Sequence, residues 1–132
     1  MSDPLYYVDR SDLLEGSIEE VRSRMRDLAA FVEANEPRLI AYHFFVDEAG
    51  STMTLVAVHP DSASMEFHMD LGAEKFRGFA GLIRMRSIDV YGRPGPAVVE
   101  RLLRKAEMLG GGTVTLHTQE AGFHRLPPDQ VK

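Results

Sequence analysis

Apolar side chains recur along the chain with two different spacings, and the spacing predicts which kind of element each stretch forms. In two stretches they lie three and four residues apart, which places them on one face of a helix. We expect the first helix to begin at Ser17, which can form a capping box with Glu20, and to end at Asn35-Glu36-Pro37. The second begins near Pro96 and ends at the glycines of residues 110–112. The expected apolar faces consist of Ile18, Val21, Met25, Leu28, Ala29 and Val32 in the first helix, and of Val99, Leu102, Leu103, Ala106 and Leu109 in the second.

Other stretches are rich in aromatic and β-branched residues and predict strands. After the first of them, residues 9–16 are polar and predict a loop. Asp61 is a good N-cap for a short helix that Gly72 ends, and residues 74–79 predict a further helical turn or two. The expected strands cover residues 5–8, 38–46, 52–59, 82–91 and 113–118.

The second and third strands are joined by a glycine-containing loop, residues 47–51, and predict a hairpin. If Val46 lies opposite Met53, both faces of this hairpin are mostly apolar. An antiparallel pair with one solvated face alternates instead, so both faces need cover. One face then carries Ile40, Tyr42, Phe44, Val46, Met53, Leu55, Ala57 and His59, and the other carries Leu39, Ala41, His43, Phe45, Thr54, Val56 and Val58.

The elements follow the order β-α-β-β-α-β, with one more helix and strand after them. The first six match the split-βαβ, ferredoxin-like unit, an α+β fold in which both helices lie on one face of a four-stranded antiparallel sheet. The other face is bare, and a contiguous apolar patch of this kind is typical of an interface. We therefore expect a second copy of the chain to cover it, sheet against sheet, in a twofold homodimer.

Length and composition limit the classes of protein that remain. The chain has 132 residues, which suits a single domain over 1–132: a core at 4–92, a C-terminal helix and strand at 93–118 and a tail at 119–132. It contains no cysteine, which excludes disulfides, thiolate metal sites and a cysteine nucleophile. The net charge of −5 argues against a nucleic-acid partner, and no apolar run is long enough to span a membrane. No secretory signal is recognisable at the start, so we expect a cytoplasmic protein.

Several segments together resemble the antibiotic biosynthesis monooxygenase-like family of dimeric α+β barrels. They comprise a helix that ends in "E-A-N-E-P", an aromatic strand, a glycine-containing hairpin, and a helix that carries a His and is followed by a Phe. The resemblance covers residues 4–92. The matching segments are residues 33–37, 41–48, 55–61, 67–69, Phe76 and 90–92.

The resemblance implies chemistry as well as a fold. Some members of the family oxidise quinols or anthrone-like polyketides without metal or flavin, some degrade haem, and others are decarboxylases or isomerases. Haem-degrading members use an Asn, a Trp and a His at positions that correspond here to Tyr6 or Tyr7, His68 and Gly78, so haem degradation is disfavoured. Many members also end the third strand with an acidic residue followed two positions later by an aromatic one, and this chain has Ala57 and His59 there.

His68 is the first candidate for a catalytic residue, because it matches the family's position on the helix that covers the pocket. A neutral imidazole can take a proton from a phenol or an activated C–H, and the resulting electron-rich anion can reduce oxygen without a cofactor. A half-buried His hydrogen-bonded to the backbone is the structural alternative. The expected substrate is a small apolar or aromatic molecule, polyketide-like in kind.

Five further residues are candidates for substrate binding. They are polar groups on the expected strands, and each has a structural alternative in the core or in an ion pair. If the hairpin faces are reversed, His43 and Thr54 enter the pocket and His59 leaves it. The five candidates are Tyr6, Tyr42, His59, Arg84 and Arg86.

No cofactor or metal is expected from the motifs. The histidines lack the spacing of a metal site, and neither a nucleophile elbow nor a phosphate-binding loop occurs. Two alternatives to an oxygenase stay open: a small-ligand-binding homodimer without catalysis, and an isomerase or cyclase of the same fold. The expected partners are thus a second copy of the chain and a small molecule.

Overall fold

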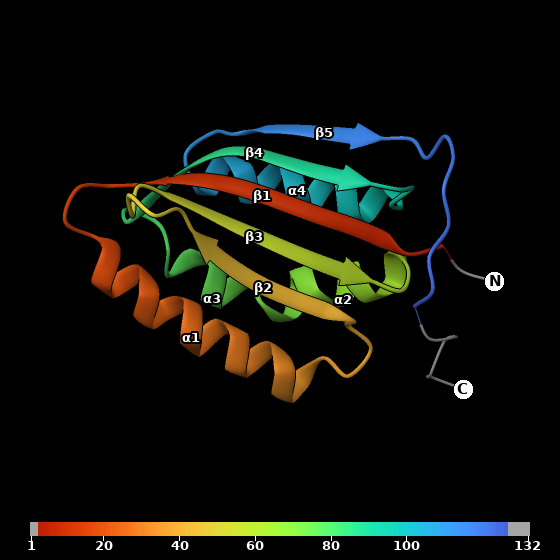
Figure 1. Ribbon diagram of the computed structural model, residues 1–132, viewed down its shortest axis with the longest axis horizontal. Coiled ribbons are helices and arrows are strands. Elements are labelled where there is room, and N and C mark those ends of the chain that lie inside the picture. The colour runs from red at the N-terminus through yellow and green to blue at the C-terminus, as the bar shows by residue number, and fades with distance from the viewer. Residues whose placement is uncertain (1–2, 127–132) are drawn as a thin grey trace.

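The computed structural model describes residues 3–126, which form one five-stranded sheet with helices on one of its faces (Figure 1). The predicted order of elements is confirmed. The strands are β1 (Leu5–Leu13), β2 (Ala41–Val46), β3 (Thr52–His59), β4 (Ile83–Tyr91) and β5 (Thr113–His117). The helices are α1 (Ile18–Asn35), α2 (Ser62–Leu71), α3 (Ala73–Arg77) and α4 (Pro96–Met108).

The strand order in the sheet is β2-β3-β1-β4-β5. The first four strands are antiparallel and have the ferredoxin-like arrangement, whereas β5 pairs with β4 in parallel. In the hairpin, Val46 lies opposite Met53, so the predicted register is confirmed. Tyr42 and His59 therefore lie on the face that the helices cover, and His43 lies on the other.

The first strand is longer than its apolar residues predict. It continues to Leu13 through the segment expected to be a loop, with a register shift between Arg10 and Ser11. Within this polar segment, alternate residues point to opposite faces. Asp9 and Ser11 consequently face the helices and are almost completely buried.

The C-terminal helix α4 packs on the sheet with a face that only partly matches the predicted one: Leu102, Ala106 and Leu109 are buried as expected. Its buried residues are Val98, Leu102, Lys105 and Ala106, whereas Leu103 is 55% exposed. The predicted face followed the apolar residues alone, and the helix instead turns a lysine inward. It ends at Met108, and Gly110 just beyond it has a φ of 125°, a left-handed conformation that glycine adopts without strain.

The two predicted N-caps have different outcomes. The Asp61 side chain accepts a hydrogen bond from the backbone N–H of Ser64, as expected for the N-cap of α2. The prediction of a capping box at the start of α1 is wrong. The Ser17 hydroxyl donates to the carbonyls of Leu14 and Leu82, which ties the start of α1 to the residue before β4 rather than capping the helix.

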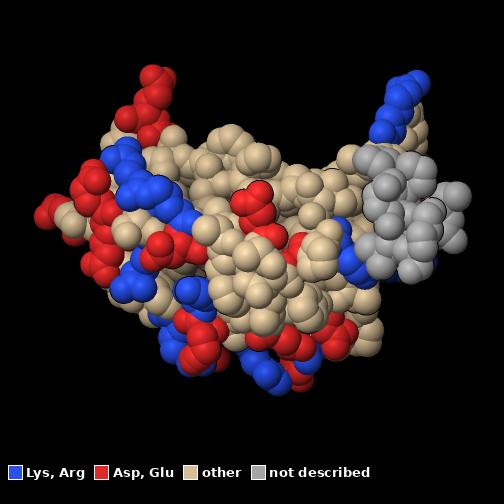
Figure 2. Space-filling model, turned by 90° about the horizontal axis from the view of Figure 1, so that it is seen from below, with Lys and Arg blue, Asp and Glu red and all other residues tan. Residues whose placement is uncertain are grey.

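The outer face of the sheet, which no helix covers, is rich in apolar side chains. Phe45 is 55% exposed and Tyr6 is 37% exposed on this face, beside the partly exposed Val56 and Val58. Figure 2, seen from the side on which α1 and β2 lie, shows uncharged surface along the middle of its upper edge, with an acidic group projecting at the left end and a basic group at the right end. Within residues 3–126, no helix is both long and apolar enough to cross a membrane.

Candidate functional site

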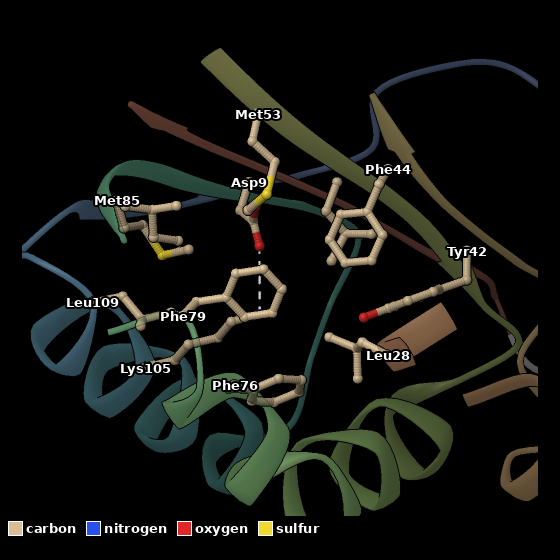
Figure 3. A pocket seen from close by; sticks show the side chains of 12 residues that line it. Asp9, Leu28, Tyr42, Phe44, Met53, Phe76, Phe79, Met85, Lys105 and Leu109 are labelled. Atoms are coloured by element: carbon tan, nitrogen blue, oxygen red, sulfur yellow. Dashed lines mark hydrogen bonds and ion pairs between the residues drawn. The ribbon is translucent and has the colours of Figure 1, made fainter. Parts of the chain in front are cut away.

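A small cavity lies between the inner face of the sheet and the helices, and we call it the inner cavity. Its volume is about 20 Å³, which is room for about one water molecule. The sheet contributes one wall, and α1, α3 and α4 contribute Leu28, Phe76 and Lys105. Most of the lining is apolar, so the few polar groups in it stand out (Figure 3).

An ion pair lies in the wall of the inner cavity. Lys105 Nζ is 3.4 Å from Asp9 Oδ2, and the side chains are 5% and 2% exposed. The Tyr7 hydroxyl donates to the same carboxylate oxygen at 2.6 Å and accepts from Lys105 Nζ at 2.9 Å. Burial lowers the pKa of Lys105, although the Asp9 carboxylate partly offsets that shift. Burial, followed by the Asp9 charge, raises the pKa of Tyr7, which keeps its hydroxyl protonated.

Two polar atoms of the cavity lining are buried without a hydrogen-bond partner. They are Oδ1 of Asp9 and the hydroxyl oxygen of Tyr42. The Tyr42 ring is partly exposed, but its hydroxyl is buried and points inward in Figure 3, towards the side where Leu28 lies. Burial, and then the nearby carboxylates of Asp9 and Glu36, raise the pKa of Tyr42, so this group is a hydrogen-bond donor at neutral pH.

A buried histidine–carboxylate pair lies next to the inner cavity. His68 Nδ1 is 2.7 Å from one Glu36 oxygen and 2.9 Å from the other, and the two side chains are 5% and 2% exposed. Burial lowers the pKa of His68, and the Glu36 carboxylate opposes that shift. A neutral ring that donates from Nδ1 to the carboxylate keeps its lone pair on Nε2, which has no hydrogen-bond partner within residues 3–126. The pair therefore has the arrangement of an oriented base.

His59 extends this cluster of buried polar groups. Its ring lies 5.5 Å from the ring of His68, and its Nδ1 is 2.9 Å from the hydroxyl of Ser64. Burial lowers the pKa of His59 to about 3, and the neighbouring His68 adds to that shift. His59 is consequently neutral at physiological pH.

Three of the six predicted site residues lie together, and three lie elsewhere. The ring of His68 contacts the rings of Tyr42 and Phe76, which both line the inner cavity, so His68 stands directly behind the cavity wall. Tyr6, Arg84 and Arg86 were also expected to bind substrate, and the structure does not bring them to the inner cavity. They point to the outer face of the sheet, because strand alternation turns them away from the helices, and Arg86 is paired there with Asp12.

Sequence reasoning missed Asp9, Glu36 and Lys105. The sequence carried a sign of the first two. Asp9 keeps the inward alternation of Leu5 and Tyr7. Glu36 places a carboxylate at the C-terminal end of a helix, where the helix dipole disfavours a negative charge unless something compensates it. Lys105 had no comparable sign beyond its place beside Ala106 and one turn after Leu102.

Metal binding has no support in the described part of the chain. No three His, Asp or Glu side chains within residues 3–126 are close enough together to hold a metal ion. The polar groups of the site are arranged in pairs instead.

Comparisons with known proteins bear on the fold. No family model matches the chain, and no curated protein matches it. Among solved structures, MupZ from Pseudomonas fluorescens is similar with a TM-score of 0.72 at 16% identity, over 92% of this chain and 94% of that one. SnoaB, a cofactor-independent oxygenase from Streptomyces nogalater, has a TM-score of 0.60 at 15% identity, over 71% and 96%. An antibiotic biosynthesis monooxygenase has a TM-score of 0.56 at 20% identity, over 65% and 92%.

The chain therefore has the dimeric α+β barrel fold of antibiotic biosynthesis monooxygenase-like proteins, which confirms the resemblance at the level of the fold. The likeness to MupZ reaches beyond the ferredoxin-like core. Residues 4–92 make up only about two thirds of the chain, so a coverage of 92% extends into α4 and β5.

Proposed function

We propose that the chain is a cofactor-independent, oxygenase-like enzyme that takes a proton from a small aromatic or polyketide-like substrate, with His68 as the base. The observation that carries this proposal is the Glu36–His68 pair, in which a buried carboxylate holds Nδ1 at 2.7 Å and leaves Nε2 free of partners in the described residues. A pKa lowered by burial keeps the imidazole neutral, the form that accepts a proton. Tyr42 and Phe76 line the inner cavity and their rings contact the ring of His68, so the proposed base is one side chain away from that cavity.

The proposed reaction needs no external reductant. His68 removes a proton from an activated CH₂ group, and the carbanion that forms passes its electrons to O₂. One oxygen atom ends as a C=O on the substrate and the other leaves as water, so that R₂CH₂ + O₂ gives R₂C=O + H₂O. The substrate supplies all four electrons, and the transferred protons end in the water. His68 returns to its neutral form when it gives up the proton.

Oxygen consumption with 1,8-dihydroxyanthrone as the probe, called anthrone below, tests this proposal, because it carries both ring hydroxyls and the activated CH₂ group. We expect the wild-type protein to consume one O₂ for each anthraquinone formed. His68→Gln should lose at least about 10²-fold of this rate, the contribution of a typical general base. His124→Gln is the matched control, because His124 is exposed, lies outside the strands of the proposed dimer contact and should leave the rate unchanged. Binding without turnover in the wild type would overturn the proposal and favour a non-catalytic small-ligand-binding protein.

A second candidate function, an isomerase or cyclase, is favoured by one specific observation. The inner cavity has a carboxylate oxygen of Asp9 and a hydroxyl of Tyr42 that both lack partners, and the ring of His68 contacts that of Tyr42. A base and a separate proton donor near one substrate suit proton transfer without oxygen. Product formation under anaerobic conditions would identify this reaction, because the oxygenase stops when O₂ is removed.

The proposed active form is a homodimer. The outer face of the sheet carries the exposed Phe45 and Tyr6 and the partly exposed Val56 and Val58, and burial of this apolar surface favours association. In such a dimer the inner cavity of each copy keeps its own helices. Each copy is then expected to have a complete set of Asp9, Tyr42 and His68.

A further inference from the structure

The polar lining of the inner cavity has an unusual hydrogen-bond balance. Oδ2 of Asp9 is satisfied by both Tyr7 and Lys105, whereas Oδ1 of the same carboxylate has no partner. The Tyr42 hydroxyl is also unpartnered, and both atoms belong to residues that line one cavity of about 20 Å³. Buried polar groups are almost always hydrogen-bonded, so two unsatisfied groups at one cavity call for an explanation.

We infer that the inner cavity binds one hydroxyl oxygen of the substrate, from a phenol or an enol, which donates its proton to Asp9 Oδ1 and accepts a hydrogen bond from Tyr42. This inference rests on the proposed function and names the substrate group that the site recognises. A single oxygen atom that both donates and accepts satisfies both orphan atoms at once. The cavity has about the volume that one such atom needs.

Other polar groups fit this site less well. A ketone oxygen accepts from Tyr42 but leaves Asp9 Oδ1 unpaired. A carboxylate would bring a second negative charge beside Asp9 in a buried place, and an ammonium would bring a second positive charge beside Lys105. A neutral hydroxyl adds no charge to the Asp9–Lys105 pair.

Lys105 and Tyr7 are positioning residues for this site. Both bind Oδ2 of Asp9, so the carboxylate is fixed with its other oxygen free for the substrate. The Lys105 ammonium also lies 4.3 Å from the centre of the Phe76 ring and 5.0 Å from that of Tyr7. The cation is therefore held in place from several sides, and the C-terminal helix α4 supplies it.

The rest of the substrate extends towards the gap between α1 and α3. A surface groove of about 300 Å³ is lined there by residues of both helices, including Asp27 and Lys75. Leu28 lines this groove and also the inner cavity, so its side chain separates the two. A ring attached to the bound hydroxyl would occupy the space that the side chains of Leu28 and Phe76 fill, so these side chains have to move aside. Phe76 contacts His68. The inferred position of the hydroxyl thus brings the attached ring next to the proposed base.

Binding of phenol, with fluorobenzene as the apolar probe of nearly the same shape, tests this inference by ligand-observed NMR titration. We expect phenol to bind the wild-type protein at least about tenfold more tightly than fluorobenzene, as two good hydrogen bonds allow. Tyr42→Phe should remove at least about fivefold of the phenol affinity and leave fluorobenzene unchanged. Asp9→Asn should weaken phenol binding in the same direction.

Tyr7→Phe is the matched control for Tyr42→Phe. The Tyr7 hydroxyl bonds Asp9 and Lys105, so its loss should lower the thermal midpoint, whereas Tyr42→Phe removes an unbonded hydroxyl and should leave the midpoint unchanged or raise it. A drop in phenol affinity without a drop in stability is the result that supports a ligand site. If phenol binds no more tightly than fluorobenzene, or Tyr42→Phe has no effect on it, the cavity holds a structural water only and the inference is overturned.

One further variant separates this inference from the proposed function. His68→Gln should keep the preference for phenol over fluorobenzene while it loses turnover of anthrone. If the wild-type protein turns over anthrone but binds phenol no more tightly than fluorobenzene, only the hydroxyl site is contradicted. If the wild-type protein prefers phenol over fluorobenzene but does not turn over anthrone, only the proposed reaction is contradicted.

Discussion

At the scale of single residues, the site is built from buried charged and polar groups that bind one another in pairs. Asp9 is paired with Lys105, and Glu36 is paired with His68, all of them nearly inaccessible to solvent. Burying such groups costs free energy unless each is compensated, so their presence in the interior is not a consequence of packing alone. The two pairs differ in one respect: Glu36 uses both oxygens, whereas Asp9 keeps one free.

The Glu36–His68 pair makes a prediction about proton affinity. Glu36 raises the pKa of His68 against the larger effect of burial, so Glu36→Gln should lower that pKa further. NMR titration of the ring nitrogens measures this directly. In the wild type we expect the proton on Nδ1 at neutral pH. An unchanged or raised pKa in the variant would contradict the assignment of Glu36 as the residue that orients His68.

His59 predicts how stability depends on pH. Its pKa is about 3 in the folded chain and about 6.5 in the unfolded chain, so below pH 6.5 the unfolded state binds a proton that the folded state does not. The free energy of unfolding should therefore fall as the pH drops from 6.5, by up to about 1.4 kcal/mol per pH unit for this group. Urea denaturation at pH 7 and pH 5 measures the slope.

His59→Asn should make that slope shallower, because Asn does not titrate. His124→Asn is the control, since His124 is exposed and its replacement should leave the slope unchanged. An identical slope in the wild type and in His59→Asn would contradict the depressed pKa.

At the scale of elements, the sequence predicts a strand or helix correctly where the residues that face the core are all apolar, and less well where a polar residue faces the core. The register of β2 against β3 was predictable because one slip would turn every side chain to the other face. The end of β1 was missed because its inward residues there are Asp9 and Ser11, which read as a loop. The buried face of α4 was predicted only in part, because Lys105 is buried while Leu103 is not. Each error falls where a polar side chain points inward, and two of these positions, Asp9 and Lys105, belong to the site.

The buried lysine of α4 makes a prediction about how this helix is attached to the sheet. Lys105→Met leaves the Asp9 carboxylate buried without its cation and should lower the free energy of unfolding by about 3–5 kcal/mol. The double variant Asp9→Asn/Lys105→Met removes both charges and should recover most of that loss. Chemical denaturation of the single and double variants measures the coupling. If the loss of unfolding free energy in the double variant equals the sum of the losses in the two single variants, Asp9 and Lys105 do not interact directly.

At the scale of the whole molecule, the fold leaves one sheet face covered by helices and the other without cover. The covered face contains the inner cavity, and the open face carries Phe45 at 55% exposure. The sequence already predicted that both faces are apolar, since the hairpin does not alternate. It could not reveal which polar atoms inside would lack partners, because that depends on contacts between residues as far apart in the chain as Asp9 and Lys105.

The open face predicts the oligomeric state. Phe45→Lys should convert a homodimer to a monomer, because it places a charge in an apolar interface, on the edge strand β2. Phe67→Lys is the control, since Phe67 is 51% exposed but lies on α2, away from the outer face. Light scattering after size exclusion measures the mass. A wild-type monomer, or a dimer that survives Phe45→Lys, would contradict the proposed sheet-to-sheet contact.

The central claim is that His68 abstracts a proton from carbon beside the inner cavity, whatever happens to the carbanion afterwards. Deuterium exchange into the methylene group of anthrone, in D₂O without oxygen, measures that step alone. We predict that the wild-type protein accelerates the exchange at least about 10²-fold over buffer and that His68→Gln abolishes the acceleration. Exchange no faster than in buffer, or equally fast in His68→Gln, would contradict the account.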